Sequence, residues 1–143
     1  MRVLLAQPNQ NRAMGLQQLA RVEPLGLEMI AGALWSRHEV VLLDLRLEPD
    51  GLADTLAALQ PHLVGISVTF TIDVYRALDI ASEAKAADPR TFVFVGGHHP
   101  ALRPQDFFHP AVDAIVVGEG ELTTSELVDT LAAEGDLERV PGL

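Results

Sequence analysis

The sequence predicts an α/β fold in which one parallel sheet lies between two layers of helices. Five short apolar runs recur along the chain, and none of them alternates apolar with polar residues. Such runs are typical of strands that are buried on both faces of a covered parallel sheet. Helical patterns of apolar residues lie between them. Strand and helix therefore alternate five times, which indicates right-handed crossovers and a doubly wound, three-layer αβα sandwich.

The predicted strands are short and rich in valine, leucine and isoleucine. In chain order they are residues 3–6, 40–43, 63–68, 92–95 and 114–117. Five strands of this kind most often adopt the flavodoxin-like (Rossmann-like) order 2-1-3-4-5, in which ligands bind at the carboxyl ends of strands 1 and 3. We therefore expect any site to be built from the loops that follow the strands.

Four helices are predicted from apolar residues spaced three or four positions apart. Their apolar stripes are Leu27, Ile30, Ala31 and Leu34; Leu52, Leu56 and Leu59; Val74, Ala77, Leu78 and Ala81; and Leu127, Val128 and Leu131. Pro89 is expected to end the third helix, and residues 104–109 to form one or two helical turns. Trp35 lies one step off the first stripe and is assigned to the core. Asp73 and Arg76 are interpreted as a solvated pair on the third helix.

The length and composition are those of a single domain with a real core. The chain has 143 residues, of which 48% are hydrophobic and 21% are charged. We assign residues 1–135 to this domain, whereas residues 136–143 lose the pattern and are expected to begin a linker. The formal net charge is −10, and such a surface repels phosphate backbones and acidic lipid headgroups. Nucleic acids and membranes are therefore not expected partners.

The chain contains no cysteine, which excludes disulfides, thiolate zinc sites and cysteine-ligated iron–sulfur clusters within these residues. Its first ten residues include an apolar run of only four residues. That run is too short for a signal peptide or a membrane span, so we expect a cytoplasmic location.

Three well-known occupants of this fold do not match the loops. A phospho-acceptor receiver needs acidic residues after strand 1, an aspartate ending strand 3 and a lysine ending strand 5, but these strands end at Gln7, Val68 and Gly118. A flavodoxin needs a hydroxyl- and glycine-rich loop after strand 1, and the loop here is rich in amides. A dinucleotide-binding fold needs G-x-G-x-x-G at its first helix, whereas the G-x-G of this chain, at residues 118–120, follows the last strand.

Small residues and hydroxyls gather instead where strands 3, 4 and 5 end. They are Ser67, Thr69, Gly96, Gly97, Gly118 and Gly120. Any single glycine among them is most simply explained by a tight strand-to-helix turn. As a set they favour a bulky ligand, because close approach to the backbone requires residues with little side-chain volume.

Two adjacent histidines, His98 and His99, are the obvious metal candidates. Neighbouring side chains in an extended loop point in opposite directions, and no third ligand lies at a typical spacing, so we do not expect a zinc site. His38, His62 and His109 lie at helix ends or beside prolines and are assigned structural roles. Since no Ser-His-Asp or Cys-His arrangement is present, the domain alone is not expected to be catalytic.

Several motifs occur in a characteristic order. They are residues 24–34 (PLGLEMIAGAL), Asp44-Leu45-Arg46, residues 64–67 (VGIS), residues 95–100 (VGGHHP) and residues 113–121 (DAIVVGEGE). In this order the chain resembles the N-terminal cobalamin-binding domain of B12-dependent radical SAM enzymes over nearly its whole length. A C-x-x-x-C-x-x-C motif is missing, so the resemblance places the [4Fe-4S] cluster and S-adenosylmethionine in a C-terminal radical SAM domain outside this sequence.

The resemblance implies that cobalamin is bound base-off, with its dimethylbenzimidazole tail lowered between the strand ends. Ser67 and Thr69 would line this slot, and Gly96 and Gly97 would let the nucleotide pass against the backbone. The other implied contacts are Pro8, Asn9 and Gln10 under the corrin ring, Gly118, Glu119 and Gly120 closing the far side, His98 as a donor to a cobalamin side chain, and Val68, Pro100 and Val117 in the same strand-end segments.

The first loop departs from the pattern of the cobalamin mutases and methionine synthase. Those proteins carry D-x-H-x-x-G there, and its histidine ligates cobalt. Here the nearest register is residues 10–15, with Gln10 and Arg12 in place of the aspartate and the histidine. An arginine has no free lone pair for cobalt, so no loop histidine is expected as a ligand.

We therefore expect a module that presents cobalamin to a radical SAM domain for methyl transfer or ring-forming chemistry. The alternatives are a stand-alone cobalamin carrier or sensor, and a cofactor-free interaction domain of the same fold.

Overall fold

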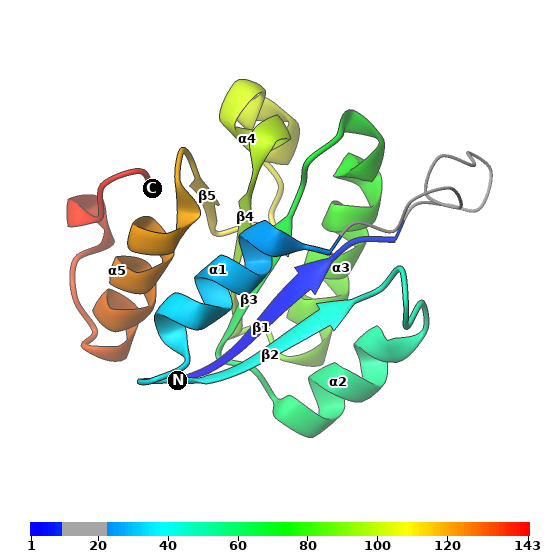
Figure 1. Cartoon of the computed structure of the whole chain (residues 1–143), viewed down its shortest axis with the longest axis horizontal. Coiled ribbons are helices and arrows are strands. Elements are labelled where there is room, and N and C mark those ends of the chain that lie inside the picture. Colours follow the sequence, from blue (N-terminus) through cyan, green and yellow to red (C-terminus); the bar gives the residue numbers. More distant parts are fainter. Residues whose placement is uncertain (10–22) are drawn as a thin grey trace.

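The structure, a computed structural model, describes residues 1–9 and 23–143. Its five parallel strands form one sheet in the order β2-β1-β3-β4-β5, with helices on both faces (Figure 1). The predicted flavodoxin-like α/β class and strand order are confirmed. Because the chain passes from β1 outward to β2 and then returns to β3 on the other side of β1, the winding reverses between β1 and β3.

The predicted strands and helices are present, with short additional turns. The strands are β1 (Arg2–Gln7), β2 (Glu39–Asp44), β3 (Leu63–Ser67), β4 (Phe92–Gly96) and β5 (Ala114–Val116). The helices are α1 (Leu25–Leu34), α2 (Gly51–Leu59), α3 (Val74–Ala87), α4 (His98–Leu102) and α5 (Gly120–Ala132), with 3₁₀ turns η1 (Thr71–Asp73), η2 (Pro104–Phe107) and η3 (Leu137–Arg139). Helix α3 ends two residues before Pro89, as predicted.

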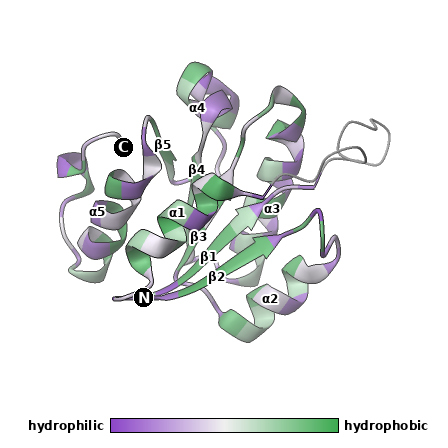
Figure 2. Cartoon of the chain, in the orientation of Figure 1, coloured by the Kyte–Doolittle hydropathy of each residue, from purple (hydrophilic) through white to green (hydrophobic). Residues whose placement is uncertain are grey.

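The core has two halves, one on each face of the sheet. Leu4 and Ala6 of β1 pack with residues of α2 and α3, while Val3 and Leu5 pack with residues of α1 and α5. This alternation follows from the period of two along a strand. Both sets are buried, and the strands are predominantly hydrophobic along their length (Figure 2). Buried apolar surface on both faces explains why the runs in the sequence do not alternate.

Two predictions about single residues are wrong. Trp35 was assigned to the core, but its side chain is 80% exposed just beyond the end of α1. Asp73 and Arg76 do not form a solvated pair. Asp73 is buried at the start of α3 and accepts a hydrogen bond from the Phe70 N–H, whereas Arg76 binds Asn9 and Glu83.

Residues 136–143, the expected start of a linker, contact the domain along β5 and α5. The Val117 N–H donates to the Gly142 carbonyl at 2.8 Å, and the Thr123 hydroxyl donates to the Pro141 carbonyl at 2.9 Å. Val140 is buried in the same half of the core as α1 and α5. That this segment leads toward a further domain stays a prediction.

Gly65 in the middle of β3 offers a test of this core. A Cβ at this position would lie 2.3 Å from Cζ of Phe94 and 3.0 Å from a methyl carbon of Leu5. Overpacking of a close-packed core typically costs about 1–3 kcal/mol. We therefore expect Gly65→Ala to lower the free energy of unfolding in urea by about that amount. Adding Phe94→Leu is expected to restore much of the loss, and a double variant no more stable than Gly65→Ala would contradict this packing.

Candidate functional site

A row of residues crosses the sheet at its carboxyl edge. Ser67 of β3 is paired with Gly96 of β4, and Gly96 is paired with Val116 of β5. Gln7 of β1 extends the row, because the residues before Gln7 and Ser67 are paired with each other. Leu5, Leu63 and Phe94, which precede members of the row by two or four positions, belong to the core half under α1 and α5. The row therefore lies on that face of the sheet.

The first turns of helix α5, which follow the carboxyl end of β5, also carry small residues. Gly120 and Thr124 lie four residues apart, on the helical face that continues into the core residues Leu127 and Val128. A Cβ on Gly120 would lie 3.0 Å from Cδ1 of Ile30 of α1. We call Ser67, Gly96, Gly118, Gly120 and Thr124 the small-residue rim. These five positions carry little side-chain volume, whereas Gln7 and Val116 of the same row carry larger side chains.

The glycines at the edge are glycines for different reasons. Gly97 has a φ of +114°, and a Cβ there would lie 2.8 Å from the Val68 carbonyl oxygen. Backbone packing alone therefore requires glycine at this position. Gly96 differs, because its Cβ would meet only ordinary contacts, the nearest being 3.4 Å from Cβ of Val116. At Gly118, with a φ of +91°, no heavy atom of the described chain lies within 4 Å of the Cβ position.

The other predicted site residues divide by burial. Thr69, His98, Val117 and Glu119 are exposed at the carboxyl edge, whereas Pro8, Val68 and Pro100 are buried beneath it. Asn9 is half-buried, and its side-chain oxygen accepts a hydrogen bond from Nε of Arg76 at 3.0 Å. Gln10 lies outside the described residues. The carboxyl edge thus brings together most of the predicted site residues, but Pro8, Val68 and Pro100 are buried in the interior of the domain.

Sequence reasoning missed a polar network around His99. His98 and His99 begin helix α4 instead of lying in an extended loop. His99 is buried. Its Nε2 lies 2.9 Å from an Asp106 carboxylate oxygen, and its Nδ1 lies 3.2 Å from the Thr71 hydroxyl oxygen. The His99 and Phe107 rings pack in a T-shaped arrangement. This network joins η1 to α4 and η2. The spacing of these residues along the chain carries no signal for it.

Asp44 and Arg46 form a bidentate ion pair at the end of β2. Nε and Nη2 of Arg46 donate to the two Asp44 carboxylate oxygens at 2.8 and 2.6 Å, and this hydrogen bonding raises the pKa of Arg46 above its ordinary value. A cleft of about 300 Å³ lies beside the pair and is also lined by Glu23, Glu28 and Glu48. None of the residues that line this cleft belongs to the small-residue rim.

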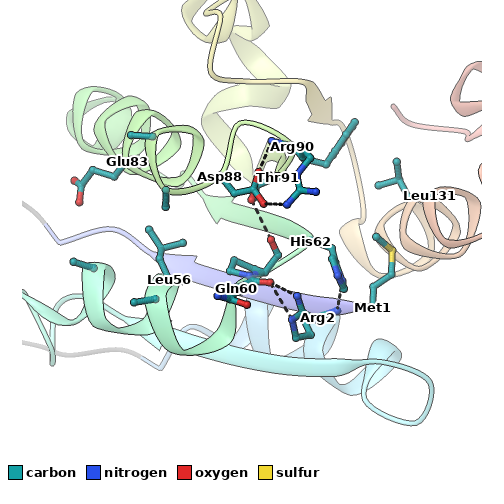
Figure 3. Close-up of a pocket in the computed structure, with 16 residues that line it drawn as sticks. Met1, Arg2, Leu56, Gln60, His62, Glu83, Asp88, Arg90, Thr91 and Leu131 are labelled. Carbon is teal, nitrogen blue, oxygen red and sulfur yellow. Dashed lines mark hydrogen bonds and ion pairs between the residues drawn. The ribbon is translucent and has the colours of Figure 1, made fainter.

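A larger cleft, of about 920 Å³, lies at the opposite, amino edge of the sheet (Figure 3). Its polar groups are engaged by the protein itself. Arg2 donates to the Leu59 and Gln60 carbonyls, and Thr91 donates to the Pro61 carbonyl. His62 accepts the Arg2 backbone N–H through Nδ1. Because these hydrogen-bonding groups are already engaged, and because the cleft lies at the edge opposite the loops that follow the strands, it is not the candidate site.

Exposed apolar side chains gather around the carboxyl edge. They come from the start of α1, the loops after β2, β3 and β5, and the first turn of α5: Leu25, Leu47, Phe70, Val117 and Leu122. Such surface commonly marks a ligand or partner site.

Within residues 1–9 and 23–143, no three histidine, aspartate or glutamate side chains form a group suited to a metal ion. No helix in those ranges is long and apolar enough to cross a membrane.

The chain belongs to the B12 binding domain family, which matches residues 12–128. It is 36% identical over 130 residues to hopanoid C-3 methylase of Methylococcus capsulatus, covering 86% of this chain and 25% of that protein. It is 34% identical over 87 residues to TokK of Streptomyces tokunonensis, a cobalamin-dependent radical SAM methyltransferase, covering 59% of this chain and 13% of that protein. The predicted family is confirmed.

The fold is also that of a solved cobalamin protein. The chain aligns with the cobalamin-dependent S-adenosylmethionine radical enzyme OxsB, solved with aqua-cobalamin bound, at a TM-score of 0.78 and 22% identity. The alignment covers 99% of this chain and 20% of OxsB. The chain therefore spans between about an eighth and a quarter of the length of these proteins.

Proposed function

We propose that this domain binds cobalamin base-off and inserts the nucleotide tail at the small-residue rim, between the sheet and helices α1 and α5. The observation that carries the proposal is the low side-chain volume of the small-residue rim, on the sheet face that α1 and α5 cover and on the face of α5 that packs into the same half of the core. Ser67 and Gly96 stand on the sheet, and Gly120 and Thr124 stand on α5. A flat aromatic base would pack closely against residues of this size, whereas bulky aliphatic residues at these positions would exclude it.

The residues of the edge fit the cofactor. Gly96 and Gly118 leave space where a Cβ would meet ordinary contacts or none among the described residues. The hydroxyls of Ser67 and Thr69 would form hydrogen bonds with the nucleotide tail. Glu119 would accept a hydrogen bond from a ribose hydroxyl or a corrin amide. Exposed apolar residues such as Phe70 and Leu122 would contact the corrin ring or the adjoining domain.

The remaining predicted contacts take two roles in this proposal. Pro8, Asn9 and Gln10 would lie under the corrin ring, and the exposed His98 and Val117 would contact its rim. Val68, Gly97 and Pro100 would act through the backbone; the Val68 N–H donates to the Gly96 carbonyl and so links the ends of β3 and β4.

We further infer that this chain supplies no loop histidine to cobalt. The loop after β1 has Gln10 and Arg12 where the ligating motif has its aspartate and histidine. Both ring nitrogens of His99 are engaged, by Asp106 and Thr71, so His99 is not free to bind the metal.

In the longer protein, we propose, this module presents cobalamin to a C-terminal radical SAM domain that carries the [4Fe-4S] cluster and S-adenosylmethionine. Bound cobalamin would supply the chemistry for methyl transfer or for ring formation. The residues of this chain would bind the cofactor, orient it and exclude water from its lower face.

The direct test is binding of hydroxocobalamin by the purified domain. We expect the cofactor to stay with the protein through gel filtration and its visible spectrum to shift to the base-off form. Retention with a base-on spectrum would contradict tail insertion. If the domain did not retain the cofactor, the binding proposal would fail and a scaffold role would be favoured.

A further inference from the structure

The Thr124 hydroxyl on α5 is an unusual polar group for a core position. Its side chain is fully buried, and no group in the described part of the chain forms a hydrogen bond with Oγ1. A hydroxyl inside a helix ordinarily finds the carbonyl four residues earlier, as Ser82 does on α3 by donating to Leu78. The neighbouring Thr123 is also satisfied, since it donates to Pro141. Burying an unpaired polar group is costly, so its presence requires an explanation.

The hydroxyl lies at the small-residue rim. Oγ1 of Thr124 is 4.0 Å from the position that a Cβ on Gly120 would take, and that position is 3.0 Å from Cδ1 of Ile30. It therefore lies where α5 approaches α1. The same helical face leads down to Leu127 and Val128 in the core half shared with the sheet. A group that separates α5 from the sheet at the carboxyl edge would come within reach of this hydroxyl.

Cobalamin in the base-off state has a complementary unpaired atom. When the dimethylbenzimidazole leaves cobalt, its ring nitrogen keeps a free lone pair, and burial of that lone pair requires a hydrogen-bond donor. We propose that Thr124 is a cofactor-binding residue whose hydroxyl donates to this released nitrogen. Two polar atoms that would each be unpaired alone then satisfy one another in the complex. The inference rests on the proposed function, because it requires the tail to enter at the rim.

The test uses Thr124→Val, which keeps the shape of the side chain and removes the hydroxyl. Since the hydroxyl is unpaired in the ligand-free domain, we expect the melting temperature to stay the same or rise. The Kd for hydroxocobalamin, measured by absorbance titration, is expected to rise about tenfold, the loss of one well-made hydrogen bond. Thr124→Ser, which keeps a hydroxyl, is expected to bind within about threefold of the wild type.

Thr123→Val is the matched control, because it removes a hydroxyl that is already paired within the protein. It is expected to lower the melting temperature and to leave the Kd for cobalamin unchanged. Diaquocobinamide, which lacks the nucleotide tail, is expected to bind the wild type and Thr124→Val equally. A cobamide with p-cresol as its lower base, which has no ring nitrogen, is also expected to bind both proteins equally.

The outcomes separate the two proposals. If the wild type does not bind hydroxocobalamin, the proposed function itself fails. If the wild type binds and Thr124→Val binds equally well, the role of Thr124 is overturned. An equal loss with cobinamide would place the contact on the corrin instead of the tail, and an equal loss with the p-cresol cobamide would exclude the ring nitrogen. Either result would overturn the assignment.

Discussion

Replacing Gly97 by alanine is expected to lower the free energy of unfolding by about 3 kcal/mol or more. The residue has a φ of +114° and a ψ of −171°, a region that is essentially restricted to glycine and costs about 1–3 kcal/mol for other residues. The added Cβ would also lie 2.8 Å from the Val68 carbonyl oxygen. Neither backbone can yield easily, because the Val68 N–H donates to Gly96 and its carbonyl accepts from the His99 N–H. Urea unfolding followed by circular dichroism measures the loss.

Gly32→Ala is the control for this experiment. Gly32 lies within α1, and apart from its chain neighbours and the backbone of its own helix no heavy atom of the described residues lies within 4 Å of its Cβ position. Alanine is favoured over glycine in a helix interior by about 0.5–1 kcal/mol, so this variant is expected to be slightly more stable than the wild type. A Gly97→Ala protein as stable as Gly32→Ala would contradict the close approach of β3 and β4 described above.

The second large effect is expected on binding. Gly96→Val is predicted to weaken cobalamin binding at least about 100-fold, or about 2.7 kcal/mol, while changing stability by less than about 1 kcal/mol. A Cβ at Gly96 meets only ordinary contacts with Val116, and valine is well suited to a strand. The added methyl groups would lie on the rim, in the proposed path of the nucleotide tail. Absorbance titration with hydroxocobalamin measures the loss.

A graded series separates blockage of the tail from general damage to the domain. Gly96→Ala adds one methyl group and is expected to lose far less affinity than Gly96→Val. Cobinamide lacks the tail, so its affinity is expected to be nearly the same for all three proteins. Equal losses of cobalamin and cobinamide affinity in Gly96→Val would show that the rim does not receive the nucleotide.

The sheet could be predicted from sequence because its evidence is local. Each strand is a run of adjacent apolar residues, and alternation of strands with helices is enough to indicate the winding. Burial of individual residues at helix ends depends on distant parts of the chain instead. Trp35 follows the apolar stripe of α1 but lies just beyond its last residue, where nothing in the described chain covers it. Asp73 is buried because η1 turns it inward at the start of α3.

The residues of the candidate site could be named from sequence, but the structural reason for each of them could not. Gly96 and Gly97 are adjacent and indistinguishable in sequence, yet only Gly97 is required by contact with the Val68 backbone. Thr124 carried no signal, because a threonine within a helix is ordinarily solvated or bonded to the preceding turn. What distinguishes it is that its buried hydroxyl has no hydrogen-bond partner among the described residues, and this depends on the three-dimensional structure.

Some motif residues that carried the family resemblance serve the fold. Asp113 accepts hydrogen bonds from the Val93 N–H at 2.7 Å and from Lys85 at 2.6 Å, and so joins the start of β5 to β4 and α3. Asp44 likewise holds Arg46 at the end of β2. The shared motifs therefore include residues whose hydrogen bonds join elements of the fold.

A crystal structure of the domain with hydroxocobalamin tests the whole account most directly. It should show the dimethylbenzimidazole detached from cobalt and seated between β3, β4 and α5, with its ring nitrogen within hydrogen-bonding distance of the Thr124 hydroxyl. If the base stayed on cobalt, or lay outside the rim with Ser67, Gly96 and Thr124 covered by protein side chains, the account would be wrong.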